Sequence, residues 1–143
     1  MSPRVFTVEE VEALIPTLAH LVTAQLEQQG DIEQRLAQLA RLAGGLPRSL
    51  DDEANDVDDV SRLKRDLRER IAHYEDGWRK VSELGAVIKD PQLGLVDFYG
   101  RIDGRLVWLC WKYGEESLGY YHELETGFSG RRPLAPLRER LLN

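Results

Sequence analysis

Hydrophobic residues in the first part of the chain recur every three or four positions, which is the period of one face of an α-helix. This first stripe consists of Val11, Ile15, Leu18, Val22, Ile32, Leu36 and Leu39, with a gap over Gln25, Gln28 and Gln29. Thr7 and Glu10 have the spacing of a capping box, so a helix should start near Val8. A pair of glycines followed by Pro47 should end it, because glycine caps helices and proline prevents their continuation.

Pro16 lies inside this stripe. Proline lacks the backbone N–H that a helix needs, and its ring clashes with the preceding turn. We therefore expect a kink or a short break near Ile15, after which the helix resumes.

A second stripe with the same spacing predicts a helix over residues 57–84. Its members are Val57, Val60, Leu67, Ile71, Tyr74, Trp78 and Val81. Because the intervening segment is short, the two helices should form a long antiparallel, coiled-coil-like hairpin over residues 6–84. Such a hairpin leaves apolar surface on its outer side, which the C-terminal part, a second copy or both must cover. We therefore predict a homodimer.

The segment between the helices is strongly acidic. Residues 51–59 contain six acidic side chains and no basic one. Their spacing matches no EF-hand calcium loop, which needs a central glycine and a final glutamate. We interpret the segment as a solvated linker whose acids favour the positive N-terminal end of the second helix.

After Gly85 the pattern changes to short hydrophobic runs separated by turn signals, which predicts a small antiparallel β-meander over residues 85–134. The expected strands are residues 86–88, 93–99, 105–112 and 118–123. Asp103-Gly104 is the strongest short hairpin signal in the chain. Residues 135–143 would form a C-terminal tail or a short helix at 136–142. The predicted fold is α+β, in a single domain over residues 1–143.

The first hairpin fixes which residues share a face. If Asp103 and Gly104 form a two-residue loop, Asp97 lies opposite Cys110. One face then carries Leu95, Asp97, Tyr99, Trp108, Cys110 and Lys112, and the other, which looks buried, carries Val96, Phe98, Val107, Leu109 and Trp111. The second hairpin stays open. An odd loop would put Tyr120 and His122 on the Asp97 face, and an even loop would put Tyr121 and Glu123 there.

Composition narrows the class of protein. The length of 143 residues suits one domain, and the net charge of -6 disfavours a nucleic-acid partner. The one cysteine excludes an internal disulfide and a zinc site made of cysteines alone. The chain has neither an apolar run of about twenty residues nor an apolar N-terminal signal region, so we expect a cytoplasmic protein without a membrane partner.

Several motifs resemble those of a bacterial family labelled domain of unknown function 2203. They are GLVDF, DGRLVWLCW, a GE pair, YYHEL and GFSGRRPL, preceded far upstream by Phe6 and the run TVEEV. The resemblance covers essentially the whole chain, with the specific motifs concentrated in residues 93–134. Members of the family often carry Trp beside the histidine, where this chain has Tyr120-Tyr121, and Gln in place of Arg132. The resemblance supports the fold outlined above and implies no activity.

The candidate chemistry lies in the C-terminal half. The residues concerned are Asp97, Cys110, Glu115, His122, Glu123 and Arg131. Carboxylate, thiolate and imidazole are ligands of zinc and other divalent transition metals, with Asp97 and His122 as the metal ligands we favour. An aspartate inside an apolar strand costs several kcal/mol to bury without a partner, so Asp97 needs His122, an arginine such as Arg131, or a metal.

Other interpretations of these residues remain open. Cys110 can be a small buried hydrophobe and His122 a hydrogen-bonded sheet residue. A Cys110–His122 nucleophile pair would need an environment that stabilises the thiolate. Arg131 and Arg132 follow flexible glycines and could bind an anion or pair with acidic surface groups. A pocket, if present, should open on the face of Asp97 and Cys110, with His122 and Glu115 at its edge.

Two classes of function follow from these features. The first is a binding or assembly module that self-associates through its helical hairpin. The alternative is a small metal- or ligand-binding enzyme with a site around Asp97, Cys110 and His122. The sequence names no catalytic residue and no cofactor beyond a divalent transition metal.

Overall fold

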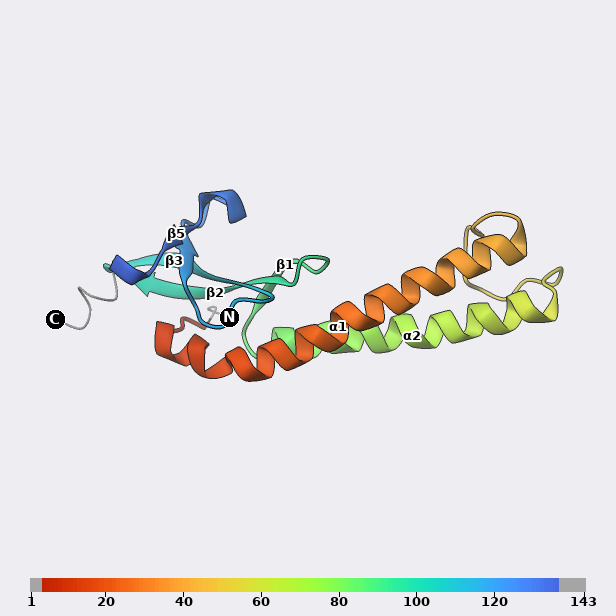
Figure 1. The fold of residues 1–143 in the computed structure, drawn as a ribbon, viewed down its shortest axis with the longest axis horizontal. Helices are drawn as coiled ribbons and strands as arrows, with labels where there is room; N and C mark the ends of the chain where they lie inside the picture. Colours follow the sequence, from red (N-terminus) through yellow and green to blue (C-terminus); the bar gives the residue numbers. More distant parts are fainter. Residues whose placement is uncertain (1–3, 137–143) are drawn as a thin grey trace. The chain divides into compact units, whose positions relative to one another are not determined.

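The chain folds into two long helices followed by a five-stranded antiparallel sheet, an α+β fold (Figure 1). This computed structural model describes residues 4–136. The elements are α1 (Val8–Ala43), α2 (Asp58–Glu83), β1 (Val87–Asp90), β2 (Leu95–Ile102), β3 (Arg105–Lys112), β4 (Tyr120–His122), the 3-10 helix η1 (Phe128–Gly130) and β5 (Arg132–Pro133). The helix predicted at 136–142 falls almost entirely outside the described residues. Within them, neither helix is long and apolar enough to cross a membrane.

The chain divides into two compact units. One, which we call the sheet unit, comprises Met1–Thr23 and Lys80–Asn143, and the other, which we call the arm, comprises Ala24–Arg79. Both boundaries lie inside helices, so each helix contributes to both units. The first part of α1, up to Thr23, and the end of α2, from Lys80, therefore belong to the sheet unit, although the sequence assigned them to the hairpin.

The start of α1 has the predicted capping box. Thr7 Oγ1 accepts a hydrogen bond from the N–H of Glu10 at 3.1 Å, and the N–H of Thr7 donates to Glu10 Oε1 at 2.9 Å. Both groups would otherwise be unpaired donors at the helix end. Pro16 lies inside α1, which continues through it, so the helix has no break there, although its first turns bend (Figure 1).

Within the arm, the two helical segments pack through one hydrophobic cluster. It consists of Ile32, Leu39, Val60, Leu63 and Leu67, with Leu36, Leu50, Ile71 and Tyr74 against it. The glutamine gap in the first stripe also faces inward, since Gln25 is buried and its Nε2 donates to the backbone oxygen of Tyr74 at 2.6 Å. Gly77 makes room for it, because a Cβ there would collide with the Gln25 amide.

The acidic linker is less solvated than we predicted. Lys64 on α2 is 1% exposed, and its Nζ donates to the backbone oxygen of Asp51 at 3.0 Å and to Asp56 Oδ2 at 2.8 Å. Arg68 donates to the backbone oxygen of Leu50 in the same segment. The linker therefore closes over a buried lysine, which the alternating charges of α2 did not reveal.

The sheet has the strand order β1-β2-β3-β4-β5, and its first hairpin has the predicted register. Ile102 pairs with Arg105 and Asp97 with Cys110. Asp103 and Gly104 have φ angles of 52° and 78°, as expected for a two-residue turn with both central residues left-handed. In the second hairpin, His122 pairs with Trp108, so the connection is of the odd kind and places His122 on the Asp97 face.

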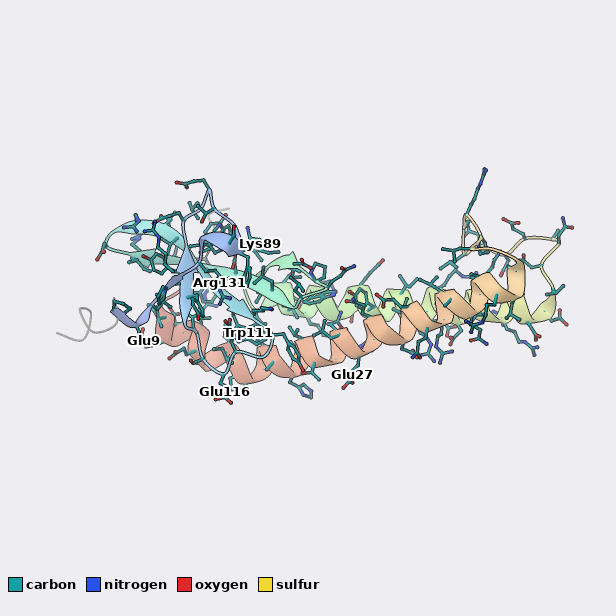
Figure 2. All side chains as sticks on the ribbon, turned by 45° about the horizontal axis from the view of Figure 1, so that its top comes forward. Glu9, Glu27, Lys89, Trp111, Glu116 and Arg131 are labelled. Atoms are coloured by element: carbon teal, nitrogen blue, oxygen red, sulfur yellow. The ribbon has the colours of Figure 1, made fainter. Side chains whose placement is uncertain are left out.

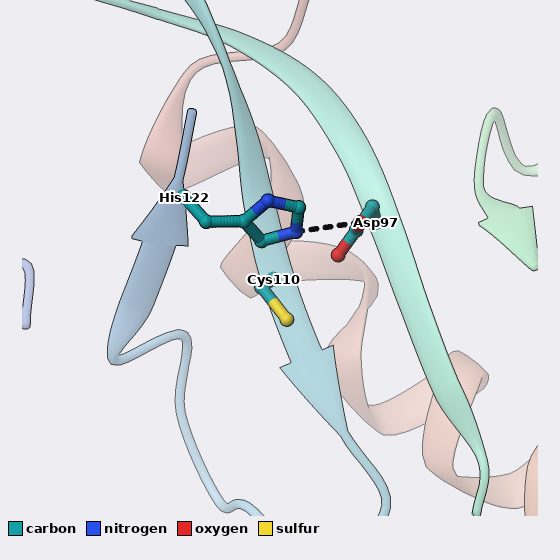
Figure 3. Close-up of side chains that lie close together, drawn as sticks. All are labelled: Asp97, Cys110 and His122. Atoms are coloured by element: carbon teal, nitrogen blue, oxygen red, sulfur yellow. Dashed lines mark hydrogen bonds and ion pairs between the residues drawn. The ribbon is translucent and has the colours of Figure 1, made fainter. Parts of the chain in front are cut away.

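Both faces of the sheet are buried at its centre, whereas we expected only one. On the face opposite to Asp97, Phe98 packs edge-on against Phe6, with ring centroids 5.1 Å apart. The first turns of α1 lie behind the strands on this side (Figure 3). On the Asp97 face, Asp97 is 1% exposed and Cys110 is 0% exposed. Long side chains cover that face, for example Lys89, whose Nζ lies 3.8 Å from the centre of the Trp108 ring.

Candidate functional site

Three potential metal ligands converge on the buried Asp97 face of the sheet. Asp97 projects from β2, Cys110 from β3 and His122 from β4 (Figure 3). One ligand atom from each residue lies within 4.8 Å of the other two. The strand register explains this convergence, because Asp97 is directly opposite Cys110 and His122 lies one pair further along on the same face.

The hydrogen bonds of His122 define its tautomer. Its Nδ1 lies 3.0 Å from the backbone oxygen of Glu123. A carbonyl oxygen only accepts, so Nδ1 carries the hydrogen. In a neutral ring Nε2 then carries no hydrogen and can only accept, yet it lies 2.8 Å from Asp97 Oδ2, which is also an acceptor. Two acceptors at this distance need a proton or a cation between them. A backbone carbonyl that orients one ring nitrogen while the other binds is also the usual arrangement of a metal-binding histidine.

The second carboxylate oxygen of Asp97 is unpaired. The Cys110 thiol lies close enough to the Asp97 carboxylate for their interaction to raise the pKa of the thiol. Asp97 Oδ1 is nevertheless buried, and no group within residues 4–136 meets hydrogen-bond geometry with it. Such a group costs free energy comparable to a lost hydrogen bond, and more when it is charged. The site therefore contains an unsatisfied acceptor directly beside the imidazole and the thiol.

Cys110 does not have the environment of a nucleophile. Burial raises the pKa of its thiol, the Asp97 carboxylate raises it further, and the positive charge of Arg131 opposes both effects only in part. Nε2 of His122 faces Asp97 Oδ2, and within residues 4–136 no hydrogen bond joins the ring to the Cys110 thiol. The geometry thus disfavours the Cys110–His122 pair as catalytic, whereas a metal would replace the thiol proton directly.

Two of the predicted acidic site residues lie outside this cluster. Glu115 accepts from Nη2 of Arg131 through both its oxygens, at 2.8 and 2.6 Å. Glu123 pairs with Arg105 at 2.7 Å, and the hydrogen bond from Arg105 lowers the pKa of Glu123. Glu123 nevertheless contributes to the site through its backbone oxygen, which no sequence pattern could have indicated.

Glu115 also lines a groove on the other side of the sheet. This groove, of about 490 Å³, lies between α1 and the β3–β4 connection and is lined by residues that include Ile15, Pro16, Trp111 and Glu116. Trp111 and Glu116 are labelled in Figure 2. Trp111 is on the face opposite to Asp97. The groove is therefore separate from the Asp97–Cys110–His122 cluster.

Sequence reasoning missed Lys89, which lies over the Asp97 face. Its ammonium stacks on Trp108, the residue opposite His122. The available signal was strand alternation in β1, but that strand was too short to assign a register from sequence.

Comparison with known proteins identifies a family but no activity. No curated protein and no solved structure matches the chain significantly. The family described as "Uncharacterized conserved protein (DUF2203)" matches residues 4–134, which include both helices, the whole sheet and all three residues of the cluster. The chain therefore belongs to the DUF2203 family of uncharacterised conserved proteins.

Proposed function

We propose that this protein binds a divalent transition metal through Asp97, Cys110 and His122. The observation that carries the proposal is the buried Asp97 carboxylate, which faces the Nε2 of His122 and keeps its second oxygen unpaired. A metal ion between these groups would satisfy both the carboxylate and the imidazole. It would also use the Cys110 sulfur, which lies in the same small cluster.

The ligand set favours one class of metal. One oxygen, one imidazole nitrogen and one sulfur suit Zn²⁺ and related transition ions, whereas calcium and magnesium prefer oxygen ligands alone. Three protein ligands leave a fourth position of a tetrahedral ion open, which is typical of catalytic rather than structural zinc sites. We therefore favour a small metal-dependent enzyme over a metal that only stabilises the fold.

Binding should be coupled to proton release. The thiol of Cys110 must lose its proton, and so must any group that holds a proton between His122 and Asp97. Raising the pH removes these competing protons, so the apparent affinity should increase with pH. Each released proton contributes about a tenfold change per pH unit.

Metal analysis of untagged protein tests the proposal. The protein is incubated with Zn²⁺ or Co²⁺, desalted and analysed for bound metal. We expect one equivalent in the parent and a loss of affinity of at least about tenfold in Asp97→Asn, Cys110→Ser and His122→Gln. His73→Gln is the matched control, because His73 is an exposed histidine of the arm and should leave binding unchanged.

The opposite outcome has a clear meaning. If the parent takes up no metal at micromolar concentrations, and the three variants only lose stability, the cluster is a buried polar network. The metal-binding function would then be abandoned. Cobalt adds a second readout, because coordination by Cys110 should produce a sulfur-to-metal absorption band that disappears in Cys110→Ser.

Self-association through the arm is the second candidate function. The large hydrophobic side chains of the arm that are exposed are Leu42, Leu46 and Val57, which lie where the two helices connect. The predicted apolar flanks along the hairpin have no such residues within the described chain, so a second copy would bind at this end. Light scattering should report a dimer that Leu46→Glu dissociates, and a parent that is strictly monomeric would exclude it. The cytoplasmic location and the absence of a nucleic-acid partner stay predictions.

A further inference from the structure

The proposed metal site, on which this inference rests, leaves one coordination position for a further ligand. We propose that this ligand is an oxyanion, a carboxylate or phosphate group, and that Arg131 holds it at the metal with help from Lys89 and Lys112. Metal binding alone would not require these cations. Their placement on the same face of the sheet indicates the class of molecule that the site accepts.

The side chain of Arg131 contacts β4, the strand that pairs with β3 at Cys110. Tyr120 is directly opposite Cys110 in the sheet, and the guanidinium carbon of Arg131 lies 3.9 Å from the centre of the Tyr120 ring. Phe128 contacts the same guanidinium, with its ring centre 4.7 Å away. Opposite residues share a face, so the Tyr120 ring that Arg131 contacts is on the side of the sheet that carries the cluster.

Arg131 has a hydrogen-bond donor to spare. Its contacts with Glu115 involve only Nη2, and its buried Nε has no partner among the residues that the structure describes. The side chain is 11% exposed, so leaving this N–H unpaired is costly. An oxyanion would accept from it in a charge-assisted hydrogen bond, which is stronger than one between neutral groups.

Two further cations lie on this face. Lys112 is two residues beyond Cys110 on β3, and its Nζ is 5.5 Å from the centre of the Phe128 ring. Lys89 stacks on Trp108. In the described part of the chain, both ammonium groups contact aromatic rings and neither has an ion pair. The chain as a whole has a net charge of -6, whereas on this face Lys89 and Lys112 add two positive charges to the Arg131–Glu115 ion pair.

These charges select an anion over other ligands. A divalent metal bound to one thiolate, one carboxylate and a neutral imidazole has no net charge, so the surrounding cations remain available to an incoming anion. A cationic ligand would be repelled, and a neutral acceptor would form a weaker hydrogen bond with the Nε of Arg131 than an anion does. Tyr120 and Phe128 are 38% and 41% exposed, which marks the edge of the face from which an anion can approach.

Cobalt-loaded protein tests this inference. The visible absorption of the bound Co²⁺ is titrated with inorganic phosphate and, separately, with acetate, so that the two sources of oxyanion are distinguished. We expect at least one of them to shift the spectrum to saturation. In Arg131→Gln, the half-saturating anion concentration should rise by about tenfold or more while the Co²⁺ affinity changes far less.

Arg132→Gln is the matched control, because Arg132 is the exposed neighbour of Arg131 and pairs with Tyr121, which belongs to the other face. It should leave the anion titration within about twofold of the parent. If Arg131→Gln does not fold, Lys112→Gln replaces it and should weaken the anion in the same direction.

The outcomes separate the two proposals. If the protein binds Co²⁺ but neither anion changes its spectrum, or if Arg131→Gln and Lys112→Gln titrate like the parent, the anion inference is wrong and metal binding stands. If no Co²⁺ binds at all, the metal proposal and this inference are both wrong.

Discussion

Lys64 in the arm and Asp97 in the sheet unit are both charged side chains that are almost completely buried, but their surroundings differ. In the arm, Lys64 is 1% exposed, and its ammonium meets two oxygens, the backbone oxygen of Asp51 and the carboxylate of Asp56. In the sheet unit, Asp97 is also 1% exposed, yet one of its oxygens lies against a ring nitrogen and the other forms no hydrogen bond with residues 4–136.

This difference separates a structural contact from a candidate site. A buried charge is tolerated when its hydrogen-bonding capacity is satisfied, and Lys64 comes close to that condition. Asp97 does not meet this condition, because its Oδ1 lacks a hydrogen bond within the described residues. An unsatisfied buried carboxylate beside a thiol and an imidazole is what a site prepared for a cation requires. The predictions below test this comparison, from the largest effect to the smallest.

Truncating a core residue in each unit should give the largest effects. Phe98 in the sheet unit and Leu67 in the arm are both 0% exposed. Phe98→Ala should lower the free energy of unfolding by about 3–5 kcal/mol and Leu67→Ala by about 2–5 kcal/mol, through lost burial and the cavity left behind. Chemical denaturation followed by circular dichroism measures both. Glu27→Ala is the control for the arm, because Glu27 is exposed on α1 away from the proposed dimer surface and should change stability by less than about 0.5 kcal/mol.

Metal should stabilise the protein by binding in the sheet unit. A substitution in the arm should leave this gain in stability unchanged. At a free Zn²⁺ concentration of one hundred times Kd, a site that exists only in the folded protein adds about 2.7 kcal/mol to the free energy of unfolding. Asp97→Asn should fold and lose this gain, whereas Lys64→Met should keep it. Thermal denaturation with and without Zn²⁺ provides the measurement. Equal stabilisation of the parent and Asp97→Asn would show that the metal binds elsewhere.

Removing the buried lysine should cost less than either core truncation. Lys64→Met keeps most of the side-chain volume but leaves the oxygens of Asp51 and Asp56 without their donor, for an expected loss of about 1–3 kcal/mol. The result is compared with Arg62→Met on the exposed surface of the same helix, which should be within about 0.5 kcal/mol of the parent. A loss as small in Lys64→Met would mean that the linker contact does not contribute to stability.

The same contact should appear in the pH dependence. The hydrogen bond from Lys64 lowers the pKa of Asp56 in the folded protein. A lowered folded-state pKa contributes stability above the unfolded value, about 3.9 for aspartate, and that contribution disappears as the pH falls through the folded-state value. The acid-induced loss of stability below about pH 4 should therefore be smaller in Lys64→Met than in the parent.

Pro16→Ala should have the smallest effect. Pro16 is exposed and α1 continues through it, so alanine restores a helical N–H without disturbing a packed side chain. We expect an intact fold, equal or higher helicity by circular dichroism and a change in stability below about 1 kcal/mol. Unfolding of this variant would show that the bend at the start of α1 is a required corner.

Local patterns in the sequence were sufficient for both helices and for β1 to β4, but not for η1 and the two-residue β5. The helix starting at Val8 follows from the Thr7–Glu10 capping box, and the register of β2 against β3 follows from Asp103-Gly104. Both signals act over a few residues, where backbone geometry and hydrogen bonding leave little choice. The same register predicts that Asp97 lies directly opposite Cys110, as it does in the structure.

Only the tertiary structure decided what those residues meet. The side of the sheet on which His122 lies depends on a nine-residue connection between paired residues Cys110 and Tyr120, whose parity no local signal sets. The burial of Lys64 depends on how the linker folds back over α2. The unpaired oxygen of Asp97 depends on three strands at once. Local chemistry thus determined the elements and the candidate ligands, whereas contacts between residues distant in sequence determined which of them form a site.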